Sequence, residues 1–187
     1  MQTPVEIVKE KIVFNDKLVI EEGKLSAKGK TFSRLKVNRE NASAVLILNT
    51  DTNKVILTKQ FRYAIASKVA EPILEIVAGK ADGDEDPFQT ARREAEEEVG
   101  YRISEANTKL LLSCFPTPGY SSEQFFVYYA TVTNADKVSE GGGLEEENES
   151  IEVVEMPLDK FINLIRDGMI KDAKTYIAGM HMILQWH

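Results

Sequence analysis

The first part of the chain carries short runs in which apolar and polar residues alternate. Two of them, EIVKEKIVF at 6–14 and KLVIEEGKL at 17–25, are separated by an Asn-Asp pair. Alternation with a period of two is typical of strands with one apolar face, and Asn and Asp favour turns. The pattern predicts a small antiparallel sheet between Val5 and Glu40.

Later runs of apolar and β-branched residues predict further strands. The first two of these runs are separated by Thr-Asp-Thr-Asn at 50–53, a turn composition, so we expect them to form a hairpin. The predicted strands cover residues 43–49, 54–60, 72–78, 109–115, 124–132 and 151–155.

Three segments show a helical pattern instead. Asp86 followed by Pro87 predicts a helix start, because Asp accepts hydrogen bonds from free backbone N–H groups and Pro suits the first helical position. Gly100 predicts its end. Two closing helices are expected at 158–166 and 173–186. In the first helix an apolar stripe is formed by Phe88, Ala91, Ala95 and Val99.

Composition and charge narrow the class of protein. The 187 residues suit one ordinary domain with an appendage, and 43% hydrophobic with 28% charged residues excludes a disordered or fibrous chain. Lys and Arg total 23 against 30 Asp and Glu, a net charge of −7, so we expect no nucleic-acid partner and no anionic membrane surface. An anionic ligand would need local cations or a metal.

Cysteine and histidine usage excludes two further features. Cys114 is the only cysteine, so no intrachain disulfide exists, and both histidines lie near the C-terminus, which excludes a Cys/His zinc site. The longest apolar stretches, such as AVLIL at 44–48, are too short to span a bilayer. We therefore expect a cytoplasmic protein.

The segment GKADGDEDPFQTARREAEEEVGY at 79–101 carries the candidate chemistry. On a helix, Glu94 and Glu98 lie on one face, where like charges oppose each other by a few tenths of a kcal/mol. A divalent cation would remove that conflict, and oxygen ligands without His or Cys favour Mg²⁺ or Mn²⁺. The alternative is a solvated, salt-bridged helix face.

The spacing of residue types in this segment resembles the signature box of the Nudix hydrolases. The family's two aliphatic positions fall on Ala95 and Tyr101, which are departures. The resemblance implies an α/β (α+β) Nudix fold, a mixed β-sheet sandwiched between helices, at 41–187, with an antiparallel β extension at 1–40 for dimerisation. The matching positions are Gly79, Glu85, Arg93, Glu94, Glu97, Glu98 and Gly100.

The resemblance implies roles for the acidic residues of the box. Glu94 and Glu98 would bind catalytic Mg²⁺, with Mn²⁺ as a substitute and Glu97 for a second ion. The carbonyl of Ala78 would add a backbone ligand.

Four other box residues would support this site. Arg93 and Glu85 would form an ion pair that orients the loop. Gly79 would allow a close approach at the loop, and Gly100 would end the helix.

Features outside the box resemble the ADP-ribose pyrophosphatase branch. The segment CFPTPGYSSEQ places Pro118 and Glu123 in a loop similar to that branch's substrate loop, and Tyr120 is a candidate for stacking on the base. Arg62, in KQFRYA, resembles the branch's substrate arginine. Taken alone, these residues also suit an ordinary proline turn and surface decoration.

The acidic stretch GGGLEEENESIEV at 141–153 is similar to the loop that supplies the catalytic base in this branch. Aligned on Glu-Asn-Glu, Glu147 takes the base position and Glu149 the neighbouring one. Without the resemblance, the stretch suits a flexible solvated loop.

The resemblance therefore implies a homodimer that hydrolyses the pyrophosphate of a nucleoside diphosphate sugar. We favour ADP-ribose, giving AMP and ribose 5-phosphate, over GDP-mannose, whose pyrophosphatases share the acidic loop. Arg34 or Arg39 is a candidate for base recognition. A nucleotide-sugar sensor that does not cleave its ligand is the alternative from another class.

Overall fold

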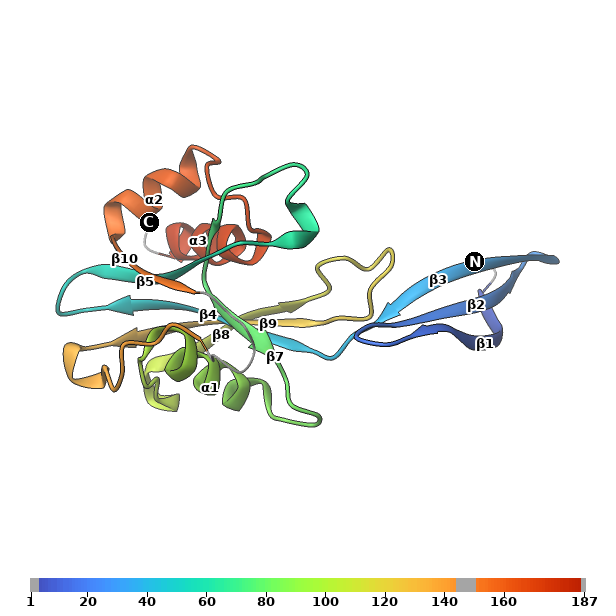
Figure 1. Ribbon diagram of the computed structural model, residues 1–187, viewed down its shortest axis with the longest axis horizontal. Helices are drawn as coiled ribbons and strands as arrows, with labels where there is room; N and C mark the ends of the chain where they lie inside the picture. The colour runs from blue at the N-terminus through green and yellow to red at the C-terminus, as the bar shows by residue number, and fades with distance from the viewer. Residues whose placement is uncertain (1–3, 144–150, 186–187) are drawn as a thin grey trace. The chain divides into compact units, whose positions relative to one another are not determined.

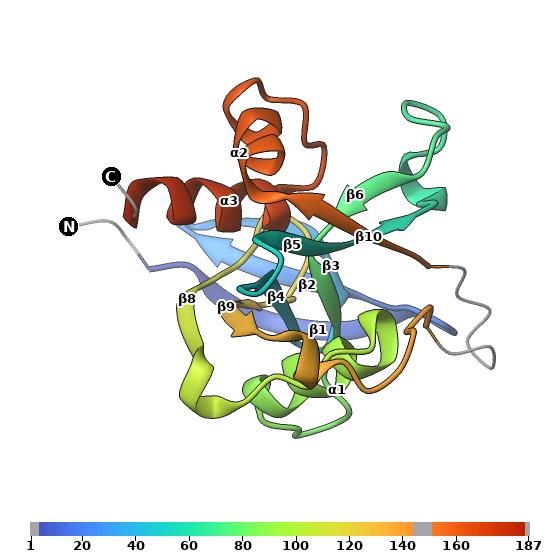
Figure 2. The same ribbon diagram turned by 90° about the vertical axis from the view of Figure 1, so that its left-hand side faces the viewer.

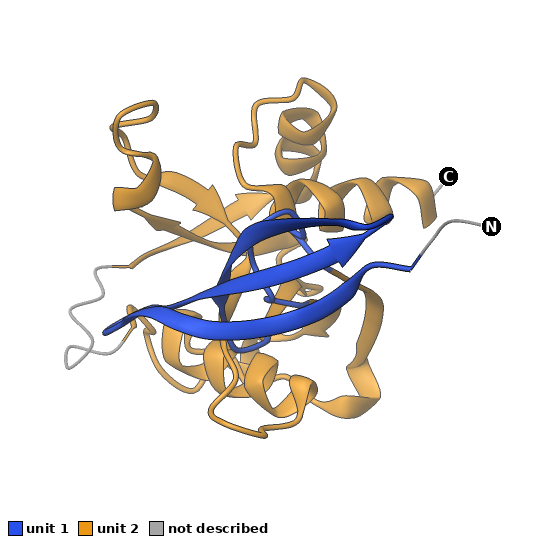
Figure 3. Ribbon diagram, turned by 90° about the vertical axis from the view of Figure 1, so that its right-hand side faces the viewer, with its two compact units in different colours: residues 1–41, 115–124 blue, residues 42–114, 125–187 orange. Residues whose placement is uncertain are grey.

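A computed structural model describes residues 4–143 and 151–185 of the chain. Its contacts group the chain into two compact units (Figure 3). The first unit contains residues 1–41 and 115–124, and the second contains the remainder. The expected domain boundary after Glu40 stays a prediction.

The first unit is built on an antiparallel sheet of three strands in the order β1-β2-β3. Lys28 and Gly29 form the turn between the last two strands, both with positive φ, which is the backbone of a tight hairpin turn. The antiparallel sheet predicted for this region is confirmed. The strands are β1 (Glu6–Asn15), β2 (Val19–Ala27) and β3 (Lys30–Asn38).

The loop at 115–124 lies against β3 within the same unit. The N–H of Val37 donates to the carbonyl of Tyr120 at 2.7 Å, and the N–H of Ser122 donates to the carbonyl of Val37 at 3.1 Å. These bonds extend the pairing beyond the three strands.

The second unit contains a sheet whose main path runs β10-β5-β4-β9-β8. Strands β4 and β9 are parallel, and the other neighbours on this path are antiparallel. The sheet is therefore mixed, as expected. The strands are β4 (Ala42–Asn49), β5 (Lys54–Gln60), β8 (Thr108–Cys114), β9 (Phe125–Val132) and β10 (Glu152–Pro157).

Helices cover both faces of this sheet (Figures 1 and 2). Helix α1 (Pro87–Val99) lies on one face, and α2 (Leu158–Arg166) and α3 (Ala173–Gln185) lie on the other. Strand β4 is buried throughout, and its successive side chains alternate between the two apolar clusters. The fold is the predicted sheet between helices. Short 3₁₀ helices lie at η1 (Tyr63–Ile65), η2 (Glu105–Asn107) and η3 (Asn134–Asp136).

The segment predicted as one strand at 72–78 is two strands with different partners. β6 (Ile73–Glu75) pairs with β5, and β7 (Val77–Lys80) pairs with β4. The N–H of Ile76, between them, donates to Thr175 Oγ1 of α3 at 2.8 Å. Apolar patterning shows that a segment is extended but not which strands it joins, so the sequence did not reveal this change.

Within the described residues, no helix has the length and apolar character needed to cross a membrane.

Candidate active site

The N-terminal cap of α1 sets where the acidic helix begins. The Asp86 carboxylate accepts from the N–H groups of Phe88 at 2.9 Å and Gln89 at 3.4 Å, and Pro87 is the first helical residue. Gly100, with φ of 74°, ends the helix. Both termini are as predicted from sequence. The buried stripe fixes the rotation of α1, so some of its carboxylates, including the buried Glu98, lie beside the core.

Two of these carboxylates meet strand β7. Gly79 lies against the Glu94 carboxylate so closely that a Cβ at this position would overlap it. The N–H of Ala78 donates to Glu98 Oε2 at 3.1 Å, and Glu98 is buried. A side chain at position 79 would therefore displace the Glu94 carboxylate.

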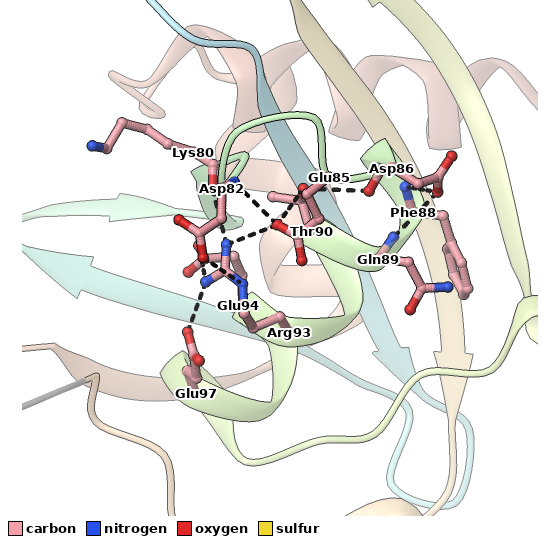
Figure 4. A network of polar contacts seen from close by, with 10 residues as sticks. All are labelled: Lys80, Asp82, Glu85, Asp86, Phe88, Gln89, Thr90, Arg93, Glu94 and Glu97. Atoms are coloured by element: carbon pink, nitrogen blue, oxygen red, sulfur yellow. Dashed lines mark hydrogen bonds and ion pairs between the residues drawn. The ribbon is translucent and has the colours of Figure 1, made fainter.

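Arg93 links helix α1 to the segment between β7 and α1 through hydrogen bonds (Figure 4). Its Nη1 donates to Glu94 Oε1 at 2.8 Å and to Glu97 Oε2 at 2.9 Å. Its Nη2 donates to the Lys80 carbonyl at 2.9 Å and to Glu85 Oε2 at 3.3 Å. The expected pair with Glu85 is present, but the contacts with Glu94 and Glu97 were not foreseen.

The charges in this network support one another. Burial opposes the charge of Arg93, but the hydrogen bond with Glu85 and the Glu94 carboxylate outweigh it, so the pKa of Arg93 is raised. Burial likewise works against the charge of Glu85, yet hydrogen bonds from Arg93 and Thr90 hold the pKa of Glu85 below its usual range. Arg93 and Glu85 therefore stay ionised near neutral pH.

The acidic residues of the box fit a hard cation by their chemistry. Glu94 and Glu98 bring carboxylate oxygens to one strand, and Ala78 has a backbone carbonyl there; oxygen ligands of this kind suit Mg²⁺ or Mn²⁺. Across residues 4–143 and 151–185, however, no three Asp, Glu, His or Cys side chains are placed so that they could hold one ion together. Metal binding by Glu94, Glu97 and Glu98 stays a prediction.

Arg62 lies between β5 and η1, and it pairs with Glu75. Its Nε donates to Glu75 Oε1 at 2.7 Å, and its Nη2 donates to Glu75 Oε2 at 2.9 Å. Lys174 also pairs with Glu75, and its Nζ lies 3.1 Å from Asp172 Oδ1. Sequence reasoning missed this cluster, although an acidic residue inside the apolar segment PILEIVA was a signal for it.

Residues of the loop at 115–124 belong to the first unit. There Arg39 Nη2 donates to Glu123 Oε1 at 3.4 Å, and the Arg34 guanidinium lies 4.8 Å from the centre of the Phe32 ring. The ring of Tyr120 is exposed. Pro118 lies in the same loop.

Glu147, the predicted base, and its neighbour Glu149 lie outside the described residues.

Comparison with known proteins decides the family. The sequence profile of the NUDIX domain matches residues 38–178. The chain belongs to the Nudix family. A GDP-mannose pyrophosphatase of Cronobacter sakazakii (strain ATCC BAA-894) is 33% identical to it over 192 aligned positions, which cover 99% of this chain and 98% of that protein.

This Nudix protein is also similar to two proteins with other names. A methanol dehydrogenase activator of Bacillus methanolicus is 34% identical over 157 positions, covering 84% of this chain and 80% of that protein. The crystal structure of an ADP compounds hydrolase matches the whole chain with a TM-score of 0.76 and covers 95% of that protein. At 22% identity, this last match shows the fold alone.

These comparisons confirm the predicted Nudix fold and the predicted pyrophosphatase branch. They also confirm the prediction that the protein is an enzyme, a Nudix pyrophosphatase.

Proposed function

We propose that this protein is a Mg²⁺-dependent hydrolase of nucleoside diphosphate sugars. The observation that supports this most is the approach of the Glu94 and Glu98 carboxylates to strand β7, inside a box that keeps every fixed residue of the family pattern. Water adds across the pyrophosphate, one bridging P–O bond breaks, and a nucleoside monophosphate and a sugar phosphate leave.

In this proposal Glu94, Glu98 and the Ala78 carbonyl hold Mg²⁺ or Mn²⁺, with Glu97 for a second ion. When bound, the cation neutralises diphosphate charge and polarises its phosphorus–oxygen bonds. Arg93 and Glu85 hold the loop in place, and Gly79 leaves room for the Glu94 carboxylate.

The chain's other residues position the substrate and move the proton. Arg62 pairs with the diphosphate, and Glu123 and Pro118 contact the substrate from their loop. Glu147 accepts the proton of the attacking water. Because phosphoryl transfer depends chiefly on positioning and charge stabilisation, we expect the metal ligands to matter more than any single base.

Two substrates have support from different observations. The loop around Pro118 favours ADP-ribose by its resemblance, whereas relatives that match nearly the whole chain are named GDP-mannose pyrophosphatases. A screen with Mg²⁺ and with Mn²⁺ that measures released monophosphate separates the two by their kcat/KM. Calorimetric binding of either sugar with no product in excess Mg²⁺ would instead show a sensor.

The exposed apolar residues of the first unit support the proposal of a homodimer. Its strands and turns expose many large apolar side chains, more than a monomer usually leaves in contact with water. We assign a second copy of the same chain as its partner. The exposed residues are Val5, Ile7, Val8, Ile12, Val13, Phe14, Leu18 and Leu35.

We also propose a cytoplasmic location. The chain cannot form an intrachain disulfide, which suits that compartment.

A further inference from the structure

Glu75 is a charged residue at a position where the fold is otherwise apolar. It is the last residue of β6, lies opposite Thr58 of β5, and is only 2% exposed. A buried carboxylate is costly unless it is paired and hydrogen-bonded. Its partners therefore indicate what it does.

Two cations share this carboxylate, and they differ in exposure. Arg62 approaches in a fork, with one N–H on each oxygen, while Lys174 pairs with Oε2. The Lys174 side chain is 7% exposed and also pairs with Asp172, whereas the Arg62 side chain is 41% exposed. Lys174 is thus enclosed by its partners, and Arg62 keeps an open side.

The cluster is joined to the acidic site by a short piece of backbone. Ala78, three residues after Glu75, donates its N–H to Glu98. Burial opposes the charge of Arg62, but Glu75 and, more weakly, Glu98 and Asp172 raise its pKa. Arg62 therefore lies within electrostatic reach of a proposed metal ligand.

We infer that Glu75 is a positioning residue, which holds the Arg62 guanidinium in one orientation so that its open edge faces the substrate diphosphate. This inference rests on the proposed function. A fork on a carboxylate fixes the plane of a guanidinium, which a single contact cannot do. The second cation, Lys174, offsets Glu75, so Arg62 is held without being fully neutralised.

Positioning and simple neutralisation predict opposite effects on substrate binding. If Glu75 only neutralised Arg62, removing its charge would free a cation for the diphosphate and lower KM. If Glu75 orients Arg62, removing the fork raises KM even though the local charge becomes more positive. The sign of the change in KM therefore separates the two roles.

The experiment compares Glu75→Gln with Asp172→Asn in Mg²⁺, using whichever of ADP-ribose and GDP-mannose the wild type hydrolyses faster. Both variants remove one negative charge from the same cluster, but Asp172 contacts Lys174 and Thr175 rather than Arg62. We expect Glu75→Gln to raise KM about tenfold with kcat within about threefold, and Asp172→Asn to leave KM unchanged or lower it. A KM for Glu75→Gln at or below the wild-type value overturns the inference.

A double-mutant cycle shows whether Glu75 acts through Arg62. In an Arg62→Ala background, Glu75→Gln should leave KM where Arg62→Ala has put it. A further rise of similar size would mean that Glu75 acts elsewhere, and the inference fails. If Glu75→Gln does not fold, the variant Arg62→Lys takes its place, because it keeps the charge but loses the fork. A raised KM for Arg62→Lys supports the inference, and a wild-type KM overturns it.

The same measurements distinguish a failure of the proposed function from a failure of the role inferred for Glu75. A wild-type protein that releases no monophosphate overturns the proposed function and this role together, whereas an active wild type with an unchanged KM in Glu75→Gln overturns this role alone.

Discussion

At the scale of single residues, Arg93 stands out because one side chain donates hydrogen bonds to three carboxylates and a backbone carbonyl. The acceptors are Glu94, Glu97, Glu85 and the carbonyl of Lys80. Adjacent carboxylates on one helix repel each other, and a cation placed between them removes that repulsion. Arg93 is therefore the protein's own counter-ion for its acidic helix.

Replacing Arg93 should destabilise the fold. We expect Arg93→Met to lower the free energy of unfolding by about 1–3 kcal/mol in the presence of EDTA, because partly buried acceptors lose their donor. Arg92→Met, an exposed neighbour on the same helix, is the matched control and should change it by less than about 0.5 kcal/mol. Urea unfolding of both variants measures this, and equal stabilities would show that the network contributes nothing.

At the scale of elements, the site depends on how closely α1 approaches β7. The contact requires a glycine at Gly79, because a Cβ there would overlap the carboxylate of Glu94. The strand and the helix therefore act as one element of the site.

Adding a single methyl group should separate this pair. We expect Gly79→Ala to fold but to lower kcat/KM by about 10²-fold or more and to weaken Mg²⁺ binding, because the Glu94 carboxylate must move. Gly23→Ala, where a Cβ would meet only Leu25 at an ordinary 3.8 Å, should stay near wild type. Kinetics and calorimetric Mg²⁺ titration check this, and a fully active Gly79→Ala would show that the close approach is not needed.

The bounds of α1 were predictable because Asp86, Pro87 and Gly100 act on their own backbone. The split of the strand at Ile76 and the pairing of Glu75 with Arg62 and Lys174 were not predictable. They depend on contacts between segments distant in the chain, which local periodicity does not encode.

At the scale of the whole molecule, the chain forms two compact units and the loop at 115–124 joins the N-terminal strands. The antiparallel strands were evident from their alternation, but the loop's membership depends on bonds between β3 and residues more than eighty positions later. The first unit also exposes apolar residues, and we propose that a second copy of the same chain packs against them.

Solution mass tests that proposal. We expect sedimentation to show a dimer, and Ile12→Glu to shift it toward monomer, because a charge on the apolar surface would have to be buried at the interface. Leu184→Glu, at an apolar site on α3 that is even more exposed, is the control and should keep the wild-type mass. A wild type that sediments as a monomer at micromolar concentration contradicts the proposed dimer.

The account's central claim is that the acidic helix holds the cation that hydrolysis requires, and Glu98→Gln tests it most directly. The measurement is monophosphate release from ADP-ribose and GDP-mannose across a Mg²⁺ titration. Glu96→Gln, on the same helix and paired with Arg102, is the control. We predict a loss of about 10²-fold or more in kcat for Glu98→Gln and nearly full activity for Glu96→Gln. Unchanged Mg²⁺-dependent turnover in Glu98→Gln would contradict the account.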